Sequence, residues 1–183
     1  MVAAHLGRAN ELKYMIPNQI KCLTPDKDFV DWKGIGEVAV LPNRLSLREG
    51  PGAIDYQWPG NASAALHAAS LQSVPSEPGG KPVIYIFPAW PTEWDTDFKL
   101  LARGAFIVSA SQKKGEIEFV IVEFKAGGEC RLKNQWPADL LSMEKEGKEV
   151  EKISGDILTF SMTKDETITL VKSDPALSDP GSL

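Results

Sequence analysis

The sequence has no long hydrophobic run and no recognisable leader. No stretch reaches the roughly 18 apolar residues that a membrane-spanning helix needs, so we expect no membrane partner. The opening residues, MVAAHLGRANELKYMI, lack a basic segment followed by an apolar stretch, which is the pattern of a secretory signal. If a larger parent protein is secreted, its signal is expected upstream of this chain.

The chain also lacks a basic excess and a cysteine spacing typical of zinc sites. Its formal net charge is −5 over 183 residues, which argues against a nucleic-acid partner bound through its phosphates. There are two histidines and two cysteines, and Cys22 and Cys130 show no CxxC spacing. This pattern predicts no metal site and no disulfide framework, but two free and buried thiols. We expect no cofactor.

The hydrophobic period changes from helical to alternating across a Pro/Gly/Ser-rich hinge within residues 66–90. Before the hinge, apolar spacing predicts one amphipathic helix over 3–14, ended by Pro17. Asn61 is a suitable N-cap for a second helix over 62–73, which is apolar around most of its circumference. Such a helix needs partners on several sides, so we expect an exposed apolar face and a missing partner.

After the hinge, short alternating segments follow one another at the spacing typical of a β-sandwich. Lys113–Gly115 is a plausible hairpin turn, and 144–152 has the charges of a protected sheet edge. The fold is predicted to be mainly β, with an antiparallel β-sandwich over 75–172 after a helical and loop segment over 1–74. Residues 173–183 are expected to fray. The predicted strands are 82–87, 102–111, 116–124, 126–134, 148–153, 156–161 and 166–171.

Four short segments also occur in a specific order: LQS from Leu71, IFPAWP from Ile86, LARGAF from Leu101 and GGECR from Gly127. Together they resemble the C-terminal region of glycoside hydrolase family 95, which comprises α-L-fucosidases and related α-L-galactosidases. The resemblance covers roughly residues 53–136.

The resemblance implies a fold with an N-terminal β domain, a helical linker, a catalytic (α/α)6 barrel and a C-terminal β-sandwich. Residues 1–74 would then be the end of the barrel and 75–172 the sandwich. The implied parent reaction is inverting hydrolysis of terminal α-L-fucosides or related sugars. The general acid and most of the barrel would lie upstream of Met1, so this chain alone is expected to be inactive.

One catalytic and three substrate-binding residues are candidates. The family's water-activating Asp lies in a QIDGNFG-type turn, and the matching AIDYQWPG segment makes Asp55 the candidate general base. The alternative for Asp55 is an ordinary loop carboxylate that shapes a turn. Trp58, Trp90 and Trp94 are candidate sugar-stacking residues, with Asp95 and Asp97 as hydroxyl acceptors. The alternative is that Trp90 and Trp94 pack the sandwich against the barrel.

Three functional hypotheses follow from these observations. The chain is a structural, accessory part of a family-95-like hydrolase, a carbohydrate-binding module without catalysis, or a truncated reading frame without an independent role. The expected partner is a carbohydrate. Self-association and association with the missing catalytic barrel are the two ways to cover the apolar helix.

Overall fold

The computed structural model describes residues 1–23, 39–40, 46–47 and 57–173. The chain divides into two compact units, Met1–Ala69 with Pro88–Pro91 and Ser70–Phe87 with Thr92–Leu183. None of the described helices has the length and apolar character needed to cross a membrane. The predicted frayed tail lies, apart from Ser173, outside the described residues.

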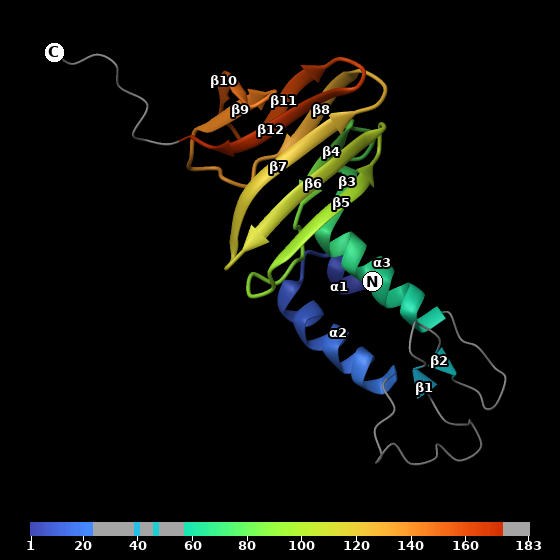
Figure 1. Cartoon of the computed structure of the whole chain (residues 1–183). Coiled ribbons are helices and arrows are strands. Elements are labelled where there is room, and N and C mark those ends of the chain that lie inside the picture. The colour runs from blue at the N-terminus through green and yellow to red at the C-terminus, as the bar shows by residue number, and fades with distance from the viewer. Residues whose placement is uncertain (24–38, 41–45, 48–56, 174–183) are drawn as a thin grey trace. The chain divides into compact units, whose positions relative to one another are not determined.

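The first unit contains the helices (Figure 1). Its elements are α1 (Val2–His5), α2 (Ala9–Leu23), β1 (Ala39–Val40), β2 (Ser46–Leu47) and α3 (Gln57–Ser70), the last residue of which already belongs to the second unit.

The predicted helix over 3–14 is in fact two helices separated at Gly7. Gly7 has φ +69°, a left-handed conformation that glycine adopts without a steric penalty. Its N–H donates to the Ala4 carbonyl at 3.3 Å, and the Arg8 N–H donates to the Ala3 carbonyl at 2.9 Å. This pair of bonds is the Schellman motif, which satisfies the last carbonyls of α1 and ends it.

The prediction that Pro17 ends the helix is wrong, because α2 continues through it to Leu23. Pro17 is exposed, whereas Leu12 and Ile16 of the same helix are buried. The proline removes one backbone hydrogen bond but leaves the buried face of the helix undisturbed.

The helix predicted over 62–73 begins at Gln57 and ends at Ser70, so both of its ends lie earlier than predicted. Pro59 lies in its first turn, where the missing N–H has no intrahelical partner to lose. Its apolar face is not exposed as predicted, since Ala65 and Ala69 are buried. A segment distant in sequence contacts the end of this helix, where the Ala89 N–H of the returning segment Pro88–Pro91 donates to the Ala69 carbonyl at 3.3 Å.

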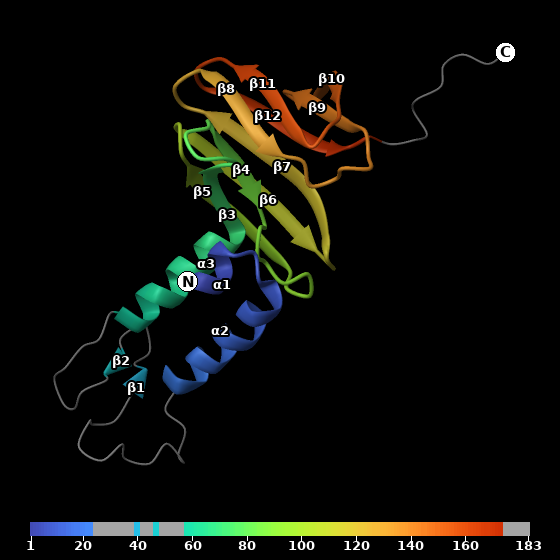
Figure 2. The same cartoon turned by 180° about the vertical axis from the view of Figure 1, so that it is seen from behind.

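The second unit is a β-sandwich of two sheets, as predicted (Figures 1 and 2). The larger sheet has the strand order β10-β9-β12-β7-β6-β5, and the smaller has the order β11-β8-β4-β3. All neighbouring strands are antiparallel except β4 and β8, which are parallel. The strands are β3 (Leu71–Pro75), β4 (Pro82–Ile86), β5 (Thr96–Ala102), β6 (Phe106–Lys113), β7 (Glu116–Phe124), β8 (Gly128–Lys133), β9 (Leu141–Lys145), β10 (Lys148–Ile153), β11 (Ile157–Met162) and β12 (Glu166–Lys172).

The turn chemistry of the larger sheet matches the prediction. Lys114 and Gly115 both have positive φ, and Lys113 pairs with Glu116, which is the geometry of a two-residue type I′ hairpin. Strand β10 lies at the edge of this sheet and is mostly exposed, so its alternating charges protect that edge.

The core of the sandwich lies between the two sheets. Each sheet contributes alternate apolar side chains to it, as the pleat requires. Cys130 is buried and free, as predicted, whereas the side chain of Cys22 lies outside the described residues. The largest fully buried side chains of the sandwich are Ile84, Ile86, Leu132, Leu141, Leu158, Ile168 and Leu170.

Candidate functional site

The four candidate residues from the sequence differ in how far the structure describes them. Asp55 lies outside the described residues. Trp58 lies in the first turn of α3, but its side chain is outside the described part. Trp90 and Trp94 are both half-buried and belong to different compact units, the first and the second respectively. The surroundings of Trp94 within the sandwich can therefore be described on their own.

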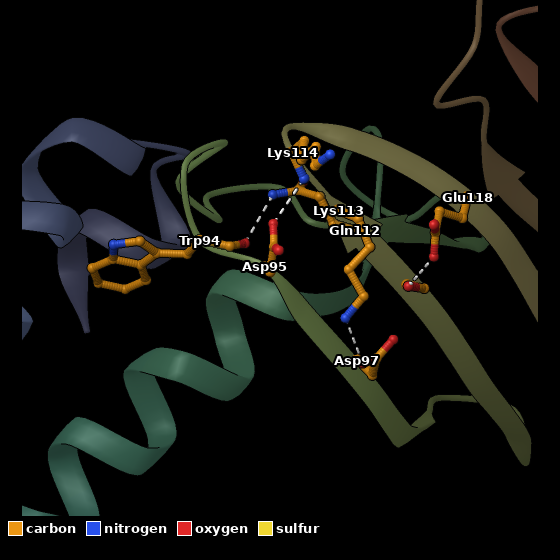
Figure 3. A network of polar contacts seen from close by, with 8 residues as sticks. Trp94, Asp95, Asp97, Gln112, Lys113, Lys114 and Glu118 are labelled. Carbon is orange, nitrogen blue, oxygen red and sulfur yellow. Dashed lines mark hydrogen bonds and ion pairs between the residues drawn. The ribbon is translucent and has the colours of Figure 1, made fainter.

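The loop that carries Trp94 connects β4 to β5 and is fixed to the β6–β7 hairpin by polar contacts (Figure 3). The side-chain amide of Gln112 donates to the Trp94 carbonyl at 3.3 Å. The backbone N–H of Lys114 donates to the Asp95 carboxylate at 2.7 Å. Because Gln112 lies near the end of β6 and Lys114 in the turn that follows it, these bonds hold the loop against the hairpin.

The carboxylate of Asp97 forms an ion pair across β5 and β6, with its Oδ2 2.7 Å from the Lys113 Nζ (Figure 3). Chiefly because Lys113 donates this hydrogen bond, the pKa of Asp97 is lowered and the pKa of Lys113 is raised. On the neighbouring strands, the Ser111 hydroxyl donates to the Glu118 carboxylate at 2.7 Å. The carboxylates around Trp94 thus already serve as acceptors within the sandwich.

This arrangement suits a structural role better than acid–base chemistry. A general acid needs a pKa raised toward neutrality, and the pKa of Asp97 is shifted in the opposite direction. Both Asp95 and Asp97 keep carboxylate lone pairs that a sugar hydroxyl could reach, since carboxylates accept several hydrogen bonds. No group of three or more metal-ligating side chains occurs among the residues that the structure describes.

A second cluster of polar side chains was missed by the sequence reasoning. It lines a cavity of about 260 Å³ in the sandwich and includes Lys81, Arg103 and Arg131. Arg103 and Arg131 belong to the LARGAF and GGECR segments, which carry the family resemblance. No local sequence pattern predicts such a cavity, because its residues come together only through the pairing of distant strands.

The fold therefore defines a β-sandwich accessory domain preceded by helices. A model of the glycoside hydrolase family 95 C-terminal domain matches residues 79–170, which is half of the chain. The chain belongs to this family, and the resemblance seen in its short segments is confirmed. No match is found among curated proteins.

Proposed function

We propose that the chain is the C-terminal part of a family-95-like glycoside hydrolase, in which the sandwich closes and braces a catalytic barrel. On this proposal residues 1–74 form the last part of the (α/α)6 barrel and residues 75–172 form the sandwich. The parent reaction is inverting hydrolysis of terminal α-L-fucosides or related sugars, with Asp55 as general base. Membership of the family supports the accessory role of the sandwich. The assignment of residues 1–74 to a barrel and the parent reaction are further parts of the proposal.

The observation that carries this proposal is an apolar surface on α1 and α2. Tyr14 is 74% exposed and Val2 72% exposed, and Leu6 and Met15 are exposed as well. Helix α2 buries Leu12 and Ile16 on the side opposite Tyr14, and Met15 adjoins this buried stripe. A surface helix of a complete domain normally keeps its apolar side chains within one buried stripe. Further barrel helices would cover Tyr14 and the other apolar side chains that remain exposed.

A hydrolysis assay tests the catalytic part of the proposal. The chain is expected not to hydrolyse aryl α-L-fucoside or aryl α-L-galactoside, because the general acid is not among its residues on this proposal. Clear turnover by the chain that disappears in Asp55→Asn would overturn the structural, accessory assignment.

Sedimentation and dye binding test the uncovered helix surface. The chain is expected to self-associate or to bind a dye specific for apolar surfaces, and Tyr14→Glu with Met15→Glu should reduce both effects. Leu101→Glu is the matched control, because Leu101 is 72% exposed but lies on β5 of the sandwich. A strictly monomeric chain without dye binding would contradict the proposal.

The second candidate function is a carbohydrate-binding module. The half-exposed indole of Trp94 beside the carboxylates of Asp95 and Asp97 favours it, since aromatic faces stack on sugar rings while carboxylates accept hydroxyl groups. Binding on a glycan array that weakens in Trp90→Ala or Trp94→Ala, with an unchanged circular dichroism spectrum, would support this function. No binding to any plant or mucin glycan would exclude it.

A further inference from the structure

The cavity around Arg103 lies within the sandwich and draws its walls from both sheets. Ser73 of β3 and Ile84 of β4 come from the smaller sheet, together with Arg131 of β8. Arg103 from the β5–β6 turn and Phe106 of β6 come from the larger sheet. The volume of about 260 Å³ is slightly below the range of about 300–1,000 Å³ that is usual for small-molecule sites, so it suits one small group.

The cavity is positively charged in an acidic protein. Three cations, Lys81, Arg103 and Arg131, and one carboxylate, Glu129, line it, which leaves an excess of two positive charges. The Lys81 Nζ lies 3.0 Å from the Glu129 Oε1, so these two charges compensate each other. The chain as a whole has a net charge of −5. The excess positive charge of the cavity therefore resides on the two guanidinium groups.

Both guanidinium groups have free donors. Arg131 donates one N–H to the Lys81 carbonyl at 3.1 Å, which orients its side chain and leaves the rest of its planar fork available. Arg103 forms no hydrogen bond or ion pair with any residue of the described part of the chain. Guanidinium forks match the geometry of carboxylates, to which they donate two parallel hydrogen bonds.

An apolar wall completes the cavity. Pro82, Ile84 and Phe106 present apolar surface to the same space. Apolar surface beside polar groups that fix the orientation of a ligand is typical of small-molecule sites.

The turn that carries Arg103 is held in place on both sides. Gly104 and Ala105 have φ of +89° and +66°, and the Ala105 carbonyl accepts the Lys125 N–H at 3.0 Å. The Ala102–Phe106 pair closes the hairpin immediately around the turn. Arg103 thus emerges from a fixed backbone, which lowers the entropic cost of binding a ligand there.

From these features we infer that the cavity binds the carboxylate of an acidic monosaccharide unit, with Arg103 and Arg131 as carboxylate donors. The assignment to a saccharide rests on the carbohydrate-related function proposed above, whereas recognition of the carboxylate rests on the cavity alone. Phe106 and Ile84 contact the apolar face of the ring.

Calorimetric titration of the full chain with D-galacturonate and D-galactose tests this inference, since the two sugars differ in the carboxylate at C6. Galacturonate should bind and galactose should not. Arg103→Gln should weaken galacturonate binding at least about tenfold, which corresponds to about 1.4 kcal/mol. Lys99→Gln is the matched control, because this exposed lysine of β5 lies outside the cavity and its loss removes the same charge.

A further titration distinguishes failure of the saccharide assignment from failure of the site itself. Acetate carries the carboxylate of galacturonate but lacks the ring, so its titration tests recognition of the carboxylate alone. Acetate that binds as tightly as galacturonate would overturn the assignment to a saccharide, and absence of galacturonate binding would overturn the site altogether. Both results are independent of the hydrolysis and self-association tests, so failure of this site and failure of the proposed function remain distinguishable. Arg103 is exposed, so an unchanged melting temperature for Arg103→Gln verifies that the variant is folded.

Discussion

The ring of Phe106 stacks on the ring of Phe124, with the ring centroids 4.0 Å apart and the planes inclined by 20°. The two residues are directly paired across β6 and β7, and both are buried. The stack is adjacent to two structural features, since Phe106 lines the cavity of Arg103 and the residue after Phe124 bonds to the β5–β6 turn. The core of the sandwich and the candidate site therefore share a wall.

Phe124→Ala is expected to destabilise the sandwich by about 3–5 kcal/mol, because it removes a buried ring and leaves a cavity beside Phe106. Urea denaturation followed by circular dichroism measures the change. Leu101→Ala serves as the control, since Leu101 is exposed and its loss should change the free energy of unfolding by less than about 0.5 kcal/mol. Equal effects of the two substitutions would show that the stacked pair is not part of the core.

Gly104→Ala is expected to destabilise the protein more than Gly147→Ala. Both glycines lie in hairpin turns with positive φ, so each alanine variant should lose about 1 kcal/mol from backbone strain. A Cβ at Gly104 would in addition lie 3.0 Å from the Phe106 ring, whereas nothing lies within 4 Å at Gly147. The stack on Phe124 restricts the movement that would relieve this contact.

The comparison of the two unfolding free energies measures the contact alone, because the strain term is common to both glycine variants. Identical losses in Gly104→Ala and Gly147→Ala would mean that the Phe106 ring moves aside freely. The same result would weaken the inference that the cavity wall is preorganised.

The sequence predicted strands well where local turn chemistry marks their ends. β7 and β10 were predicted with the bounds that the structure shows, because Lys114-Gly115 and Gly147 mark the adjacent turns. β5 was not among the predicted strands. It alternates charged and apolar residues at a sheet edge and buries little, so its pairing with β6 is what makes it a strand.

The misplaced end of α3, its unexpected burial and the missed cavity have a common physical cause. Leu71 follows α3 without glycine or proline, so only its pairing with Ile86 reveals that a strand has begun. The bond between Ala89 and Ala69 likewise depends on a segment that returns after β4. The cavity of Arg103 is a further example, since Ser73, Arg103 and Arg131 become neighbours only when strands of both sheets are assembled. Local patterns do not contain this information.

Glu166→Gln is expected to destabilise the sandwich by about 1 kcal/mol at neutral pH, because Glu166 accepts hydrogen bonds from the Lys145 ammonium group and the Thr163 N–H. These contacts lower the pKa of Glu166 in the folded state. The stabilisation is therefore present above the unfolded-state pKa and is lost as the pH falls through the lowered folded-state pKa.

Urea denaturation of the wild type and Glu166→Gln between about pH 7 and about pH 3 measures this dependence. The difference between the two proteins should shrink toward the acidic end. Asp97→Asn is the matched control, since the Asp97–Lys113 pair is well exposed and should contribute little at any pH. A difference for Glu166→Gln that stays constant down to the acidic limit would contradict the assigned ion pair.

Cys130 is expected to be unreactive in the folded protein. Its side chain is fully buried in β8, and burial raises the pKa of the thiol to about 12. Because the thiolate is the reactive form, labelling at about pH 8 should require prior unfolding of the sandwich.

Cys22→Ser leaves Cys130 as the sole thiol for a measurement with a chromogenic disulfide reagent. The native variant should label slowly and the guanidinium-unfolded variant at once, and addition of Phe124→Ala should accelerate native labelling by raising the unfolded population. Rapid labelling of the native variant would show that β8 opens locally, without loss of the core.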